Sequence, residues 1–205
     1  MADDPRFLSL IEDAAATAID GWHFSFLDGR RTSEPLPWSY EHLASDLAAS
    51  ASRVVDVDTG GGEVLARLAP PAGSVAVEDW PANVPIATRR LRPLGVEVRG
   101  RVDGKLPLDD ASTDVVLNRH GDLDLAETAR VLRPGGTLLT QQVGVGNETE
   151  LNQSFGVLAA PMPQAVADVA DLTARARDAG LVVDLAAHAV AVDRNLDVGA
   201  VVLQL

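Results

Sequence analysis

Four residues in one stretch of the chain have types and spacing that suit the binding of a nucleotide-like ligand. Asp56 ends the apolar run in VVDVDTGGGEVLARL (54–68), and Gly60 and Gly62 follow it before an amphipathic helical pattern. A strand that leads through glycines into a helix places backbone N–H groups in a crevice. Glu78 lies about 20 residues after Asp56, the offset at which an acid accepts hydrogen bonds from ribose hydroxyls.

The turn also departs from the known nucleotide-binding motifs. Asp58 stands where such turns most often place their first glycine, and Leu65 stands where the third glycine of G-x-G-x-x-G falls. No G-K-[ST] sequence occurs, so a P-loop is excluded. A glycine turn alone is also compatible with a plain connection between a strand and a helix.

The elements that must position these residues alternate between strands and helices. Branched apolar runs predict seven strands, near residues 53–57, 74–78, 96–100, 113–118, 136–143, 181–192 and 198–205. Helical patterns separate the first six strands, which indicates an α/β fold with a mostly parallel sheet and helices on both faces. Only DRNLD separates the last two strands, so we expect the last strand to be antiparallel.

We predict a single domain over residues 1–205, with an N-terminal helical cover (1–50) and a core (51–205). An apolar stripe from Phe7 to Ile19 predicts the first helix, and Ser39 is a candidate cap for a second helix that ends at Ala51.

Composition limits the classes of partner. The formal charge of −13 argues against nucleic acid, which needs a basic surface. There is no apolar run of about 20 residues and no basic amphipathic helix, so we expect neither a membrane span nor membrane binding. Cysteine is absent, which excludes disulfides and is compatible with a cytoplasmic location. A small-molecule partner fits this composition best, and we predict no metal site.

Three segments together carry a family resemblance. In chain order they are VVDVDTGGG (54–62), VDGKLPLDDASTDVVLNRH (102–120) and ETARVLRPGGTLLTQQVG (127–144). The chain resembles the class I S-adenosylmethionine-dependent methyltransferases over about residues 38 to 205, and small bacterial members most of all. The resemblance implies a Rossmann-like methyltransferase fold, S-adenosylmethionine as cofactor, S-adenosylhomocysteine as product, and methyl transfer to a small-molecule acceptor.

The resemblance assigns cofactor-binding roles to five residues of the first half of the core. Asp56 would organise the turn with its carboxylate near the methionine ammonium, and Gly60 and Gly62 would line the methionine and the ribose. Glu78 would bind the ribose hydroxyls, with Trp80 on the adenine side. Alternative roles stay open: Asp56 as a cap, Glu78 as a solvated acid at a strand end, and Trp80 as a hydrophobic helix staple.

Five further residues receive roles from the same resemblance. Asp103 and Gly104 would contact the adenine edge, although they also fit a simple turn. Asn118 and Arg119 would face the methionine and its sulfonium. Tyr40 would belong to a cover over the cofactor.

Asp58 departs from the family pattern at the methionine end of the expected site. A residue with a Cβ is costly where the backbone needs a positive φ, although Asp tolerates this region better than most residues. Its carboxylate could attract the ammonium and sulfonium or repel the cofactor's carboxylate. We therefore count Asp58 among the cofactor-binding residues, with a weakened or repurposed pocket as the alternative.

Methyl transfer from a sulfonium is an in-line displacement, in which the protein chiefly positions donor and acceptor. A hydroxyl or amine acceptor also needs a base, and histidine suits that role. His120 in LNRHGD follows the fourth predicted strand and is the candidate catalytic residue, with a structural role as the alternative. His23 in the aromatic loop is a weaker candidate, and Gln141 and Gln142 are candidate substrate contacts.

Two readings compete with methyl transfer. The chain could be a methyltransferase-like protein that catalyses a cyclisation or isomerisation, or a non-catalytic binding or dimerisation module. Asp58 and the end of the chain at Leu205, inside the seventh predicted strand, favour these readings. We expect an acceptor pocket that is more open, or one that a second subunit completes in a homodimer.

Overall fold

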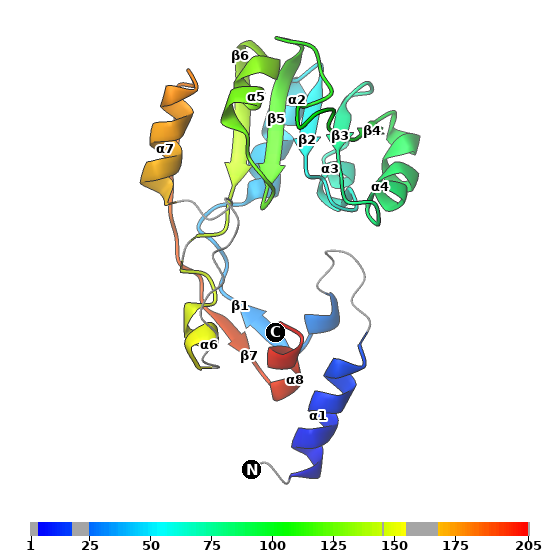
Figure 1. The fold of residues 1–205 in the computed structure, drawn as a ribbon, viewed down its shortest axis with the longest axis vertical. Helices are drawn as coiled ribbons and strands as arrows, with labels where there is room; N and C mark the ends of the chain where they lie inside the picture. The colour runs from blue at the N-terminus through cyan, green and yellow to red at the C-terminus, as the bar shows by residue number, and fades with distance from the viewer. Residues whose placement is uncertain (1–3, 18–24, 145, 155–167, 205) are drawn as a thin grey trace. The chain divides into compact units, whose positions relative to one another are not determined.

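The computed structural model describes residues 4–17, 25–144, 146–154 and 168–204 (Figure 1). They belong to two compact units, one formed by residues 40–188 and the other by residues 1–39 together with 189–205. Each unit is built around its own small sheet.

The unit of residues 40–188 contains a five-stranded sheet. Its strands are β2 (Val54–Val57), β3 (Val75–Val77), β4 (Glu97–Arg99), β5 (Thr113–Arg119) and β6 (Leu132–Gln141). They are hydrogen-bonded in the order β4-β3-β2-β5-β6, and every pair is parallel. β2 and β3 are buried at every position, as expected for valine-rich strands in the middle of a parallel sheet.

Helices cover both faces of this sheet, as the alternating elements predicted (Figure 1). On one face, α2 (Tyr40–Ser50), α3 (Glu63–Arg67) and α4 (Val84–Leu91) bury small and apolar residues against Val54, Ala76 and Leu117. On the other face, Val131 of α5 (Leu125–Val131) joins a cluster with Val55 and Val116. Neighbouring strand residues thus face opposite cores, which follows from the two-residue period of a strand.

Three further elements complete this unit: η2 (Arg92–Leu94), α6 (Thr149–Ser154) and α7 (Val169–Asp178). The Asp168 side chain caps α7 by accepting a hydrogen bond from Ala170 N (2.7 Å). Among the described residues, no helix is both long and apolar enough to cross a membrane.

The second unit joins the two ends of the chain. Its elements are α1 (Pro5–Ala15), η1 (Ser25–Leu27), β1 (Arg31–Ser33), β7 (Asp193–Asn195) and α8 (Val198–Val202). β1 and β7 pair antiparallel, with Arg31 opposite Asn195. Arg30 donates two hydrogen bonds to the Asp197 carboxylate, at 3.0 and 2.9 Å. The expected N-terminal helices are therefore present as α1 and α2, but they lie in different units.

The end of the chain corrects the prediction of a seven-stranded sheet. The run at 198–205, expected to be a strand, begins as helix α8, because the Asp197 side chain caps it at Ala200 N (2.8 Å). Glycine at 199 suits this packing, because a Cβ there would lie 2.7 Å from Leu10 O. Close packing against α1 thus requires a small residue at this position of α8.

The expected sixth strand is also absent, because residues 181–192 form no regular strand. Val182, Leu185 and Val190 in this segment are 86%, 72% and 82% exposed. The predicted antiparallel hairpin is therefore wrong, and β7 pairs with β1 instead of extending the main sheet. A short apolar run does not by itself reveal a partner strand.

Candidate active site

The order of the strands places a crevice between β2 and β5. From β2 the chain moves outward to β3 and β4, and it then returns to the other side of β2 with β5 and β6. Ligands of open α/β sheets bind where the strand order reverses, at the carboxyl ends of the strands. All the cofactor-binding residues expected from the sequence, and His120, lie in the unit of residues 40–188.

The glycine turn after β2 has the close packing that its sequence predicts. Gly60 and Gly62 have φ values of 63° and 77°, in the left-handed region where glycine carries no Cβ penalty. A Cβ on Gly62 would lie 2.8 Å from Leu91 of α4. Thr59 Oγ1 donates a hydrogen bond to Asp56 Oδ2 (2.6 Å), so Asp56 holds the turn in place.

Asp56 is a buried acid with a strongly shifted pKa. Burial raises its pKa to about 7, and the negative charges of Asp58 and Glu78 act in the same direction. The hydrogen bond from Thr59 and the charge of Arg119 oppose the shift. A nearby cation would favour the carboxylate form, so Asp56 fits a ligand that brings an ammonium to this point.

Glu78 is 6% exposed and held in a fixed orientation, unlike a solvated acid at a strand end. Its Oε1 accepts a hydrogen bond from Trp80 N (2.8 Å), and its Oε2 accepts a longer one from Asn83 Nδ2 (3.4 Å). Each oxygen can still accept a further bond, as ribose hydroxyls would require. Trp80 is 64% exposed, so it does not pack as a helix staple.

Asp103 and Gly104 form a tight turn after β4. Their φ values are 51° and 77°, and the backbone hydrogen bonds between Val102 and Lys105 (3.0 and 2.9 Å) close the turn. The structure therefore accounts for both residues as a turn, and the adenine contact stays a prediction.

Asn118 is fully buried at the carboxyl end of β5. Its Nδ2 donates to Val57 O and to Asp122 O, both at 3.3 Å, which ties β5 to β2 across the crevice. Its Oδ1 accepts from Thr140 Oγ1 (3.2 Å) and from Gln142 Nε2 (2.5 Å). Gln142 is thus a partner of Asn118, and its Oε1 is buried with no hydrogen-bond partner among the described residues.

Arg119 and Tyr40 form a cation–π contact at the same edge. The Arg119 guanidinium lies 5.8 Å from the centre of the Tyr40 ring. Tyr40 begins α2 and is 6% exposed, and its burial raises the pKa of its hydroxyl. The hydroxyl is therefore protonated at neutral pH.

His120 lies at the rim, at the carboxyl end of β5, where the sequence placed it. The backbone N–H of His120 donates to the backbone oxygen of Gln141 (2.8 Å), and the ring Nε2 of His120 lies 3.2 Å from Gln141 Nε2. Partial desolvation, followed by the charge of Arg119, lowers the pKa of His120. The imidazole is then neutral at pH 7 and can accept a proton. His23 lies outside the described residues.

Asp58 has a φ of 57° and takes part in a network that sequence reasoning missed. Its Oδ1 accepts from Arg101 Nη1 (2.8 Å), and its Oδ2 accepts from Asp122 N (2.7 Å). Arg101 Nη1 also donates to Asp79 Oδ2 (2.6 Å). The available signal was that Arg101 follows a predicted strand, and so had to lie at the same edge of the sheet.

The sheet order, the glycine turn and the two buried acids define a Rossmann-like fold with a nucleotide-type site. Comparison with known proteins narrows this class, because residues 55–140 match the family model described as a methyltransferase domain. A phthiotriol/phenolphthiotriol dimycocerosates methyltransferase of Mycobacterium leprae is 36% identical over an alignment of 110 positions, which covers 48% of this chain and 40% of that protein. Residues 55–140 are therefore similar to methyltransferase domains, as the resemblance to the class I S-adenosylmethionine-dependent family implied.

Solved structures agree with this assignment. A methyltransferase from Thermotoga maritima, described as S-adenosylmethionine-dependent, is 27% identical with a TM-score of 0.52, over 69% of both chains. The [4+2]-cyclase SpnF is 18% identical with a TM-score of 0.53, over 84% of this chain and 68% of that one, which shows the fold alone. The chain spans less than half the length of the curated relatives it matches.

Proposed function

We propose that this protein binds S-adenosylmethionine and transfers its methyl group to a small-molecule acceptor, releasing S-adenosylhomocysteine. The observation that carries the proposal is the pair of buried acids Asp56 and Glu78, at the carboxyl ends of neighbouring strands and beside a glycine turn. Buried acids are costly unless they are paired. A ligand with both an ammonium and ribose hydroxyls would supply partners to both.

The residues at this edge would divide the cofactor between them. Asp56 and Asp58 would bind its cationic methionine end, with Gly60 and Gly62 along its backbone. Glu78 would accept hydrogen bonds from the ribose.

The remaining residues would complete the two ends of the site. Trp80, Asp103 and Gly104 would lie on the adenine side. Asn118, Arg119 and Tyr40 would lie toward the sulfonium.

The cofactor supplies an activated methyl group on its sulfonium, so the protein has to position the acceptor in line and manage one proton. His120 would accept the proton of a hydroxyl or amine acceptor as the new bond to the methyl carbon forms. The lowered pKa of His120 suits this role, because the neutral form prevails at pH 7.

The acidity of the chain supports a small-molecule acceptor over nucleic acid or a membrane. A cytoplasmic location and a homodimer are parts of the same proposal. They rest on the sequence.

A second candidate is a methyltransferase-like protein that binds the cofactor without transferring its methyl group. The observation that favours it is Asp58, which replaces a glycine of the family pattern and spans the crevice to Arg101 and Asp122. The likeness to the cyclase SpnF shows only that the fold is compatible with this candidate.

Equilibrium dialysis with radiolabelled S-adenosylmethionine, followed by an acceptor screen that detects S-adenosylhomocysteine, tests the proposal. We expect Glu78→Gln to weaken binding about tenfold, because a charged hydrogen-bond acceptor contributes about 1.5 kcal/mol or more. Glu97→Gln is the control, because Glu97 is an exposed acid at the opposite end of the sheet, paired with Arg99. Binding without product from any acceptor would favour the second candidate, and no binding would refute both.

A further inference from the structure

Arg101 joins three loops at the edge of the sheet that holds the candidate site. It lies just after β4, and its Nη1 donates to Asp58 after β2 (2.8 Å) and to Asp79 after β3 (2.6 Å). Its backbone N–H donates to the second oxygen of Asp79 (2.7 Å). Asp58 extends the chain of contacts by accepting from Asp122 N beyond β5 (2.7 Å).

This network crosses the point where the strand order reverses. β2 and β5 are neighbours in the sheet, and Asp58 and Asp122 follow their carboxyl ends. The packing is tight there, since a Cβ on Gly121 would lie 2.6 Å from the Cβ of Asp58. The ion pair between Arg101 and Asp58 therefore lies at the position where open α/β sheets bind ligands.

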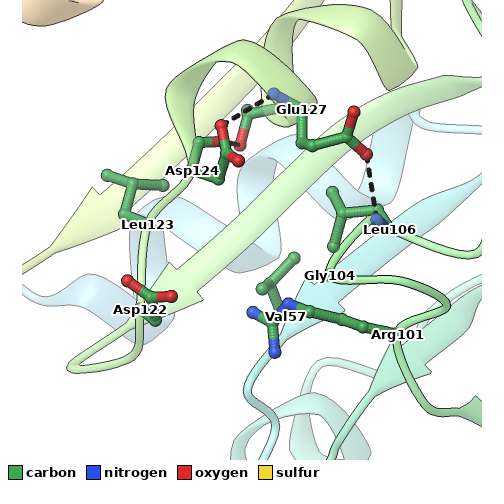
Figure 2. A pocket seen from close by; sticks show the side chains of 9 residues that line it. Val57, Arg101, Gly104, Leu106, Asp122, Leu123, Asp124 and Glu127 are labelled. Carbon is green, nitrogen blue, oxygen red and sulfur yellow. Dashed lines mark hydrogen bonds between the residues drawn. The ribbon is translucent and has the colours of Figure 1, made fainter.

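Little space is left beside the Arg101 side chain. Figure 2 shows its guanidinium beside Val57, between the loop of Gly104 and the loop of Asp122. The cavity that these residues line has a volume of about 10 Å³, which is room for about one water molecule. A purine ring is many times larger than this cavity, so the space beside Arg101 does not hold one while the side chain keeps this position.

We propose that Arg101 is a latch, whose ion pair with Asp58 closes the cofactor crevice until the cofactor's own cations replace the guanidinium. The proposal rests on the proposed function, because it concerns how S-adenosylmethionine enters that site. In the closed state Asp58 is paired with Arg101. In the bound state the ammonium and sulfonium pair with Asp58, and Arg101 keeps Asp79 as its partner.

In this proposal, pairing with the charge of Arg101 explains why Asp58 stands where the family pattern has a glycine. The side chains of Asp58 and Arg101 are 23% and 19% exposed, so leaving either one unpaired would be costly. Two hydrogen-bonded carboxylates outweigh the effect of burial and raise the pKa of Arg101, which stays charged. The product S-adenosylhomocysteine has lost the sulfonium charge, so it competes less well with Arg101, and the latch favours its release.

The test compares binding of S-adenosylmethionine and S-adenosylhomocysteine by calorimetry in four proteins: the natural sequence, Arg101→Gln, Arg101→Lys and Asp58→Asn. Arg67→Gln is the matched control, because Arg67, like Arg101, is an arginine in an ion pair between two elements, here with Glu41 between α3 and α2. Circular dichroism confirms the fold of each variant, and Arg101→Lys retains the charge if Arg101→Gln does not fold.

We expect Arg101→Gln to bind both compounds about tenfold more tightly than the natural sequence, Arg101→Lys to lie between them, and Arg67→Gln to bind unchanged. Asp58→Asn should abolish the preference for S-adenosylmethionine over S-adenosylhomocysteine. Without any ligand, hydrogen exchange at the Asp122 amide should become faster in Arg101→Gln, because Asp58 loses its partner.

Two results would overturn the latch while leaving the proposed function intact. One is equal binding by Arg101→Gln and the control, and the other is weaker binding by Arg101→Gln, which would make Arg101 a direct contact of the cofactor. Absence of binding in all the proteins would refute the proposed function, and the latch with it.

Discussion

At the scale of single residues, Asp56 shows how burial prepares a group for a ligand. In the unfolded chain its pKa has the ordinary value of 3.8, whereas burial raises the pKa to about 7 in the folded protein. Folding therefore favours the protonated acid. The contribution of this acid to stability is complete below pH 3.8 and is lost as the pH rises through about 7.

Urea unfolding of the ligand-free protein between about pH 5 and pH 8 tests this linkage. We expect the free energy of unfolding to fall as the pH rises, and Asp56→Asn to reduce this slope. Glu97→Gln should keep the slope, because Arg99 lowers the pKa of Glu97, which therefore titrates below this range. An identical slope in Asp56→Asn would mean that Asp56 is ionised in the folded protein across this range.

His120 gives a second prediction at this scale. Because its neutral ring would accept the acceptor's proton, we expect His120→Gln to lower kcat about 100-fold or more and to leave cofactor affinity unchanged. Initial rates at saturating cofactor, together with calorimetry, separate these two effects. An unchanged kcat would assign His120 a structural role beside Gln141.

At this scale the sequence predicts which residues follow the ends of the strands better than it predicts their contacts. The glycines and acids follow from the types of residue that a crevice needs after a strand. Arg101 was missed because its role depends on which loops meet in space. No local spacing relates it to Asp58, 43 positions away.

At the scale of elements, the connection between β2 and α3 depends on Gly62. An alanine there would adopt φ near 77° and bring its Cβ to 2.8 Å from Leu91. Gly73, before β3, has φ of 86° but nothing within 4 Å of a Cβ. A substitution at Gly73 therefore measures the cost of backbone strain alone, whereas one at Gly62 measures backbone strain and steric overlap together.

We expect Gly73→Ala to cost about 1 kcal/mol through backbone strain alone. Gly62→Ala should cost about 1–3 kcal/mol more, because its Cβ would also overlap the Leu91 side chain of α4. Chemical denaturation of both variants measures the difference. Equal costs would mean that Leu91 moves aside freely.

The five strands of the main sheet were predictable, because buried parallel strands have uninterrupted apolar runs flanked by turns and helices. The last two predicted strands were wrong for a physical reason. A run such as VGAVVLQL fits a short buried helix as well as a strand. The cap at Asp197 and the close approach at Gly199 decide between them.

At the scale of the whole molecule, the two ends of the chain meet in one unit, and all the described candidate site residues lie in the other. The prediction of a single domain over residues 1–205 stays a prediction. The curated relatives that the chain matches are more than twice as long as the segment they share with it. The likeness therefore concerns one segment of these relatives, and their substrates are not transferred to this chain.

The central claim is that residues 40–188 hold S-adenosylmethionine despite the aspartate at position 58. Calorimetric titration of the purified protein with S-adenosylmethionine and S-adenosylhomocysteine, with Asp58→Gly measured beside it, tests this claim most directly. We expect saturable binding to the natural sequence with one site per chain and a micromolar Kd. Absence of binding to the natural sequence would contradict the claim, and binding by Asp58→Gly alone would show that the aspartate blocks the site.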